Sequence, residues 1–373
     1  MTDVVPFTVD ISDAQIDDLR QRLNNTRFPE PETVEDWSQG APLSYVQDVT
    51  NYWADEYDWT TRQAGLNRFP QFKTQLDDLD IHFIHARSPH DNALPLLMTH
   101  GWPGSVVEFM KVIEPLTNPP DGSDAFHVVC PSLPGYGWSD KPSVTGWSVQ
   151  HIARAWTELM ARLGYDRYVA QGGDWGSAVT AGIGAIDPDH CAAIHLNMII
   201  APPGKDMLAD LTDAEKKSLE DYSFHDQWGT GYSKQQSTRP QTLGYSLVDS
   251  PVGQMAWIIE KFWQWTDCDG HPENALTRDE MLDNVMLYWL PGNGASSGRL
   301  YWESFNNRSF DKVVVPTCVS VFPKEIFRPS RRWAEPHYDI HYWNELDKGG
   351  HFAAFEQPDM FVNELRAAFR TFR

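Results

Sequence analysis

The chain has 373 residues, of which 41% are hydrophobic and 22% charged, as is typical of a globular protein with a sizeable core. It carries 52 Asp and Glu residues against 30 Lys and Arg residues, a formal net charge of −22. Phosphate backbones and anionic lipid surfaces repel so acidic a chain, so we expect no nucleic-acid partner. The 16 tryptophans exceed what a stable core needs, and we expect some of them to line a pocket.

The four cysteines show no CxxC spacing, which favours free buried thiols over disulfides or a zinc site. They are Cys130, Cys191, Cys268 and Cys318. The N-terminal MTDVVPFTVD lacks the basic and apolar regions of a signal peptide. No apolar run approaches the roughly 18 residues of a membrane span. These features predict a soluble, cytoplasmic protein.

In chain order, a capping box of Ser12 and Gln15 predicts a first helix that ends near Asn24. A second, aromatic helix is expected over roughly 45–57. From residue 80 the sequence pattern changes to apolar strands separated by amphipathic helices, which indicates a parallel sheet covered by helices on both faces. The expected strands are 81–86, 94–99, 126–130, 168–170, 313–321 and 340–343. Helices are expected from Ser105, from Ser148 and from about 359 to 369.

Residues 201–300 interrupt this pattern with polar helix formers, Trp, Pro and Gly, and without an obvious buried strand. A helical insertion within a single α/β core explains the interruption better than separate domains do. We therefore expect an N-terminal segment (1–79), a first core part (80–200), a helical lid (201–300) and a second core part (301–373).

The strongest chemical signal is QGGDWGS at residues 171–177, between an expected strand and a helix. Gly172 and Gly176 flank Asp174 at the spacing of a nucleophile elbow, where strand and helix pack too closely for a Cβ atom. The elbow usually holds Ser. An Asp at this position, kept ionised by the helix dipole, can attack a saturated carbon and form an alkyl ester. The alternative is that Asp174 is an ordinary helix N-cap.

The second signal is HGWPGS, which follows the strand expected at 94–99. A turn at this place supplies one backbone N–H of an oxyanion hole, and the residue after the nucleophile supplies the other. These residues are Trp102 and Trp175. Pro103 fixes the turn, and a cis bond before it is one way to do so. An ordinary strand–helix turn is the alternative.

The third signal is GGHF, which follows the last expected strand and makes His351 the candidate base. The partner acid is expected after the penultimate strand, where Glu325 is the first carboxylate. The alternatives, Asp339, Glu345 and Asp347, lie in or after the last strand.

Several motifs together resemble the microsomal-type epoxide hydrolases of the α/β-hydrolase superfamily. They are HGWPGS, PSLPGYGWSDKP, GGDWGS, DSPVGQMAWIIEKFWQW and GGHFAAFEQP, and the resemblance covers nearly the whole chain. It implies an α/β-hydrolase fold whose N-terminal segment wraps around the core and lid. Mammalian members carry an N-terminal membrane anchor, whereas this chain begins directly at the wrapping segment. Its layout is therefore expected to be that of the soluble bacterial and fungal members.

The family holds the epoxide oxygen with two lid tyrosines, and the matching positions are Tyr232 and Tyr301. Phenols suit this role because they can donate a proton to an alkoxide while remaining protonated at neutral pH. Tyr222 and Tyr245 are alternatives to Tyr232, and Tyr288 is an alternative to Tyr301.

The resemblance implies hydrolysis of an epoxide to a vicinal diol through an ester on Asp174. His351, oriented by Glu325, would then activate the water that resolves the ester. It implies no metal and no organic cofactor, and it suggests a homodimer. A haloalkane dehalogenase shares the elbow Asp, the His and often a Trp after the nucleophile, but it holds halide with N–H donors rather than phenols. A non-catalytic relative that binds a small molecule is the other alternative.

Aromatic residues crowd one lid stretch, at Trp257, Phe262, Trp263 and Trp265. They could form an aromatic wall for a bulky apolar epoxide or simply pack a helix on the core. Substrate identity, stereoselectivity and the choice between detoxification and biosynthesis do not follow from the sequence.

Overall fold

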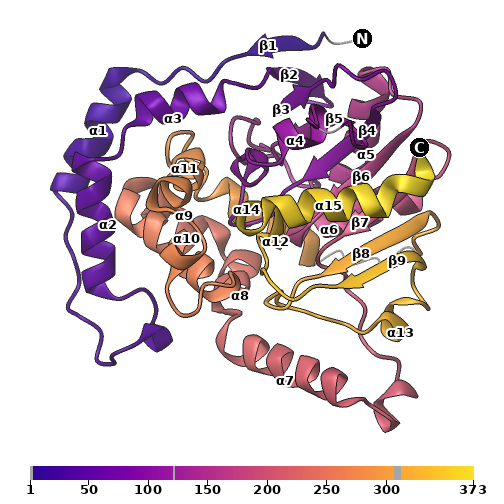
Figure 1. Ribbon diagram of the computed structural model, residues 1–373. Coiled ribbons are helices and arrows are strands. Elements are labelled where there is room, and N and C mark those ends of the chain that lie inside the picture. The colour runs from indigo at the N-terminus through magenta and orange to yellow at the C-terminus, as the bar shows by residue number, and fades with distance from the viewer. Residues whose placement is uncertain (1–2, 121, 306–311) are drawn as a thin grey trace.

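The computed structural model describes residues 3–120, 122–305 and 312–373, and its centre is a single twisted sheet (Figure 1). The nine strands of the described residues follow the order β1-β2-β3-β5-β4-β6-β7-β8-β9. Neighbours from β5 to β9 are parallel, whereas β1, β2, β3 and β5 pair antiparallel. The mostly parallel sheet expected from the sequence is thus confirmed. The strands are β1 (Val5–Phe7), β2 (Gln71–Leu76), β3 (Leu79–Ala86), β4 (Leu94–Thr99), β5 (Phe126–Pro131), β6 (Tyr168–Gly172), β7 (Cys191–Leu196), β8 (Pro316–Val321) and β9 (Asp339–Glu345).

Helices cover both faces of the parallel part of the sheet. In β7, Ile194 lies beside Gly184 of α6 (Asp174–Ile186), whereas His195 packs against Phe361 of α15 (Pro358–Phe369). Consecutive side chains of a strand point to opposite faces, so α6 and α15 lie on opposite sides of the sheet. The other helical elements of the core are η2 (Val106–Phe109), α4 (Ile113–Thr117), α5 (Val149–Arg162), α13 (Arg331–Ala334), α14 (Ala353–Glu356) and η5 (Arg370–Phe372).

The N-terminal segment contributes both helices and strands. The Ser12 N–H donates to Gln15 Oε1 at 3.2 Å, as the predicted capping box requires, and the first helix ends at Asn24. Strand β1 pairs with β2, and β2 pairs with β3, so the sheet begins within residues 1–79. The helical elements here are α1 (Asp13–Asn24), η1 (Trp37–Gln39), α2 (Leu43–Asp55) and α3 (Trp59–Leu66), the last of which was not anticipated.

A helical insertion lies between β7 and β8, and its last helix, α12, ends at residue 305. Figure 1 shows α1, α2 and α3 on the side of this lid that faces away from the sheet. The helical elements of the insertion are η3 (Met207–Ala209), α7 (Asp213–Trp228), α8 (Gly231–Thr238), α9 (Pro240–Asp249), α10 (Pro251–Trp265), η4 (Pro272–Asn274), α11 (Arg278–Trp289) and α12 (Ser296–Phe305).

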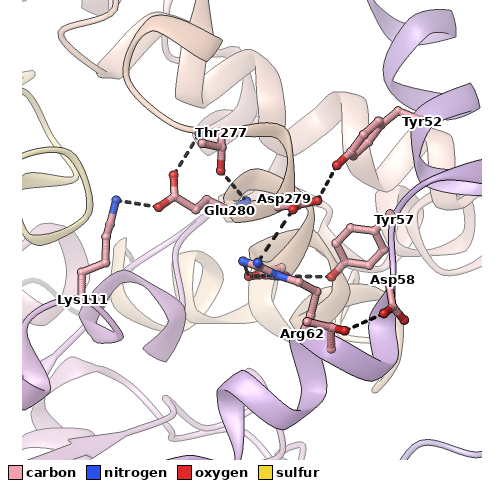
Figure 2. A network of polar contacts seen from close by, with 10 residues as sticks. Tyr52, Tyr57, Asp58, Arg62, Lys111, Thr277, Asp279 and Glu280 are labelled. Carbon is pink, nitrogen blue, oxygen red and sulfur yellow. Dashed lines mark hydrogen bonds and ion pairs between the residues drawn. The ribbon is translucent and has the colours of Figure 1, made fainter.

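A polar network fastens the N-terminal segment to α11 of the lid (Figure 2). Arg62 Nε lies 2.8 Å from Oδ1 of Asp283, and its guanidinium pairs with both oxygens of that carboxylate. The buried Tyr57 hydroxyl donates to the same Oδ1 at 2.8 Å, and Tyr52 donates to Asp279 at 2.8 Å. Polar side chains from α2, α3 and the turn between them therefore fix the position of one lid helix.

All four cysteines are free and buried, as predicted. Within the described residues, no helix combines the length and the apolar character needed to cross a membrane.

Candidate active site

Asp174 stands at the junction of β6 and α6, in a left-handed backbone conformation with φ of 49°. Such a conformation is strained for any residue other than glycine, and it is a feature of functional turns. The turn lifts the carboxylate above the carboxyl edge of the sheet, at the first turn of α6, where free backbone N–H groups favour a negative charge.

The glycines around Asp174 are required by close contacts. A Cβ atom on Gly172 would lie 2.1 Å from the carbonyl oxygen of Gly176. A Cβ atom on Gly176 would lie 1.9 Å from the carbonyl oxygen of Thr99 in β4. Both distances are below what real Cβ atoms tolerate, so strand and helix can approach this closely only with glycine at both positions. An ordinary N-cap needs no such pair.

The turn after β4 directs a backbone donor at the nucleophile. The Trp102 N–H donates to Asp174 Oδ1 at 2.8 Å, and the peptide bond between Trp102 and Pro103 is cis. The amide of Trp175 belongs to the first turn of α6, beside the same carboxylate. A hydrogen-bond donor is thus in place on the oxygen that becomes an oxyanion if Asp174 forms an ester and water attacks it.

His351 lies between two carboxylates. Its Nδ1 is 2.6 Å from Glu325 Oε1, and its Nε2 is 3.4 Å from Asp174 Oδ2. Glu325, which follows β8, is 2% exposed and also accepts a hydrogen bond from the Ile326 N–H at 2.7 Å. Of the alternative acids, Asp339 pairs with His341 at 3.0 Å, and Glu345 accepts from Trp343 at 3.1 Å.

The two carboxylates decide the charge of the buried imidazole. Burial acts to lower the pKa of His351, but the charges of Glu325 and Asp174 and their hydrogen bonds outweigh it and raise that pKa well above its ordinary value. The resting imidazole is therefore protonated at neutral pH. Loss of the charge on Asp174 would lower the pKa of His351.

Tyr232 of α8 and Tyr301 of α12 lie above Asp174 on the lid side. Their ring centroids are 5.8 Å apart, and the Tyr232 ring stacks on Trp102 at 4.9 Å. Burial, together with the Asp174 charge, raises the pKa of both phenols, so both keep their protons. Among the alternatives, Tyr222 and Tyr245 are exposed, and Tyr288 donates to the Gly104 carbonyl at 2.7 Å.

One face of α10 borders the site. Trp257 lies 6.5 Å from the Trp102 ring, and Trp265 lies 5.1 Å from the His351 ring. Between them the buried Lys261 ammonium, which pairs with Glu260, lies 4.8 Å above the Tyr232 ring. The spacing of four residues places 257, 261 and 265 on one side of a helix, and this signal could have found Lys261 in the sequence.

The other two aromatic residues singled out in α10 point elsewhere. Phe262 packs against Phe352 at 4.8 Å, and Trp263 stacks on Trp37 of the N-terminal segment at 5.0 Å. The packing alternative therefore describes their contacts. The aromatic rings that cluster around Trp102 and Tyr301 are those of Trp175, Tyr232, Trp257 and Trp265. Among the described residues, no group of three or more His, Cys, Asp or Glu side chains is arranged to hold a metal ion.

Comparisons with known proteins agree with this geometry. Residues 4–109 match the family described as epoxide hydrolase N terminus, and residues 95–223 match the alpha/beta hydrolase fold. A Stigmatella aurantiaca protein with the provisional name epoxide hydrolase is 54% identical, over 99% of this chain and 86% of that protein. Epoxide hydrolase 1 of Sus scrofa is 36% identical, over 97% of this chain and 87% of its own length.

Solved structures show the same likeness. The juvenile hormone epoxide hydrolase of the silkworm Bombyx mori superposes with a TM-score of 0.94 at 32% identity, covering 100% of this chain and 95% of that one. The Aspergillus niger epoxide hydrolase superposes with a TM-score of 0.91 at 33% identity, covering 100% and 97%. The fold is thus that of the α/β-hydrolases. Within that class the chain belongs to the epoxide hydrolase family, and it is an enzyme that hydrolyses epoxides.

Proposed function

We propose that this enzyme opens its epoxide in two steps, through an ester on Asp174. The proposal is supported by the different contacts of the two Asp174 oxygens. Oδ1 accepts a hydrogen bond from the Trp102 N–H, while Oδ2 faces His351 Nε2 at 3.4 Å. One oxygen is held in a donor pocket and the other remains a nucleophile beside a base.

In the first step, Asp174 Oδ2 bonds to an epoxide carbon, and the carbon–oxygen bond of the ring breaks toward oxygen. Tyr232 and Tyr301 hydrogen-bond that oxygen, and one of them gives it a proton. Their raised pKa values support this role, because both phenols are protonated before the reaction. The products are a hydroxyalkyl ester on Asp174 and a tyrosinate.

Before the second step, the tyrosinate takes the proton that the resting His351 carries, which leaves a neutral imidazole. His351 then removes a proton from water, and the water oxygen bonds to Cγ of Asp174. The negative charge develops on the oxygen held by the Trp102 N–H, with the Trp175 N–H as the second donor. The bond between Cγ and Oδ2 then breaks, the diol oxygen takes the proton from His351, and the proton left on the Asp174 carboxyl passes to His351, which restores the resting ion pair. Glu325 keeps the imidazole oriented throughout.

The substrate class that fits this site is an apolar or aromatic epoxide. Aromatic rings surround the phenols: Trp175 lies 4.8 Å from Tyr301, and Trp102 and Trp257 lie beyond. Such walls bind apolar surface and leave the phenols as the specific polar contacts. We expect Trp257→Ala to raise KM for styrene oxide more than for a small aliphatic epoxide.

The mechanism is tested by one turnover in ¹⁸O-labelled water with enzyme in excess. The first diol should carry no label, because its new oxygen comes from Asp174 Oδ2, and the label should remain in the enzyme. Direct attack of water on the epoxide would label the diol at once and overturn the scheme. Asp174→Ala should abolish diol formation, and retention of wild-type hydrolysis would also overturn it.

A further inference from the structure

A small cavity lies beside the nucleophile, and the two-step scheme leaves it unused. Its volume of about 20 Å³ is room for a single water molecule. Asp174 and His351 line it, together with the side chain of Glu108. Two further lining residues, Thr99 and Gln171, contribute buried oxygens, Oγ1 and Oε1, that have no hydrogen-bond partner among the described residues.

Glu108 reaches this cavity because residue 104 has no side chain. A Cβ atom on Gly104 would lie 1.4 Å from Glu108 Oε1, so the carboxyl group fills the space that any larger residue would take. The turn of η2 fixes its backbone, since the Glu108 N–H donates to the Ser105 carbonyl at 3.1 Å. Ser105 is itself anchored to Asn284 of the lid at 2.7 Å. These contacts fix the backbone from which the Glu108 carboxyl extends into the cavity.

The surroundings of Glu108 favour its uncharged form. Burial raises its pKa to about 8, the negative charges of Asp174 and Glu356 add to this, and His351 and a backbone hydrogen bond at Ser105 oppose it. The Tyr288 hydroxyl lies within its electrostatic reach as well. A protonated carboxyl has one O–H donor and free lone pairs, so it can hold a water molecule without competing with His351 for the proton.

We propose that Glu108 positions the hydrolytic water in this cavity, as the second hydrogen-bond partner of the water that His351 deprotonates. The inference rests on the proposed ester mechanism and extends it. A water held by His351 alone can rotate, whereas a second hydrogen-bond partner restricts its orientation and so helps to direct a lone pair at Cγ of Asp174. Glu108 keeps its own proton, the water proton passes to His351 Nε2, and the water oxygen bonds to Cγ.

The test separates ester formation from ester decay. Excess styrene oxide is mixed with the wild-type enzyme and with the Glu108→Gln and Glu108→Leu variants. Samples are quenched at intervals, and the ester is measured by intact-protein mass spectrometry. In Glu108→Leu the ester should form at the wild-type rate and decay about 10- to 100-fold more slowly, as expected when a reacting group is misplaced. Glu108→Gln keeps donor and acceptor, so its decay at pH 7 should lie closer to the wild-type rate.

Glu356→Gln is the matched control, because it alters a second buried carboxyl that faces His351. Backbone N–H groups of Asp267 and Phe352 already occupy the Glu356 oxygens at 2.7 and 3.0 Å. We expect this variant to lower thermal stability and to leave the ratio of the two rates unchanged. The same selective slowing in Glu356→Gln would assign the effect to charge around His351 in general and overturn the proposal.

If Glu108→Leu does not fold, the rate of ester decay as a function of pH, measured in wild type and Glu108→Gln, tests the proposal instead. Burial raises the pKa of Glu108, so wild-type ester decay should slow as Glu108 loses its proton at alkaline pH, and Glu108→Gln should lack this inflection. Identical profiles would overturn the role of Glu108. If no ester forms even in wild type, the mechanism itself fails. If the ester forms and Glu108→Leu resolves it at the wild-type rate, only this inference fails.

Discussion

His351 Nε2 lies 3.4 Å from Asp174 Oδ2, so the proposed base of the second step already contacts the proposed nucleophile of the first. In the resting enzyme this contact is an ion pair, because the raised pKa of His351 keeps the imidazole protonated. Alkylation of Asp174 removes the negative charge and therefore one of the groups that hold the proton. The first step thus prepares the base for the second.

We expect His351→Gln to trap the ester. The variant keeps Asp174, both phenols and the Trp102 amide, so the epoxide should still open. Without a base, hydrolysis should fall by about 10²- to 10⁴-fold. Intact-mass measurement after addition of styrene oxide should show one added substrate mass per chain.

Asp174→Ala is the control for this experiment, since without the nucleophile no mass should be added. If His351→Gln formed diol at the wild-type steady-state rate and showed no ester adduct, the assignment of His351 as the base of the second step would be contradicted.

A neutral residue at position 174 should lower the pKa of His351. Asp174→Asn removes the negative charge beside Nε2, as ester formation does, so the protonated imidazole loses part of its stabilisation. The sign follows directly: the imidazole should lose its proton at lower pH in the variant than in wild type. NMR of ¹⁵N-labelled imidazole as a function of pH measures both values.

Glu325→Gln provides the comparison for that titration. It removes the other carboxylate, which lies 2.6 Å from Nδ1, and it too should lower the pKa of His351. An unchanged or higher value in Asp174→Asn would mean that Asp174 does not govern the protonation of the base.

Loss of the phenols should slow ring opening rather than ester decay. Tyr232→Phe and Tyr301→Phe each remove one donor to the leaving oxygen, and we expect ester formation to slow by about 10- to 10³-fold in each. The double variant should lose nearly all activity. Rapid-quench measurements of ester formation and decay check this, and equal slowing of both steps would point to a general disturbance of the lid instead.

The arrangement of the candidate site in the core was predictable because backbone geometry limits which residues can occupy these positions. Gly172 and Gly176 mark the only kind of turn that brings strand and helix so close around Asp174. The order of strands then limits where an acid and a histidine can meet it, which is how Glu325 was preferred over acids farther along the chain.

The lid side could be predicted less well, because its contacts depend on packing between distant segments. Trp263 lies in an aromatic run, yet it stacks on Trp37, more than 200 residues earlier in the chain. Lys261 gave no signal by composition, and its place above Tyr232 depends on how α10 crosses α8. Strands β1, β2 and β7 were missed. β1 is short, β2 alternates with polar residues at an antiparallel edge, and β7 contains two alanines, which are uncommon in strands.

The contact between the N-terminal segment and the lid should contribute measurably to stability. Asp283→Ala leaves Arg62 and the buried Tyr57 hydroxyl without their partner. Because the Arg62 side chain is still 30% exposed, we expect a loss of about 2–3 kcal/mol rather than the larger cost of a fully buried pair. Urea unfolding followed by tryptophan fluorescence measures this loss.

Asp18→Asn is the matched control within the same segment. Asp18 pairs with Arg22 at 2.8 Å, four residues along one exposed helix, and such pairs contribute about 0.5 kcal/mol or less. If Asp283 anchors the N-terminal segment to α11, the Asp283→Ala variant should unfold at a clearly lower urea concentration than the Asp18→Asn variant. It should also become more sensitive to proteolysis in α2 and α3, since that segment loses its anchor. Equal effects of the two substitutions would show that the network is merely a surface feature.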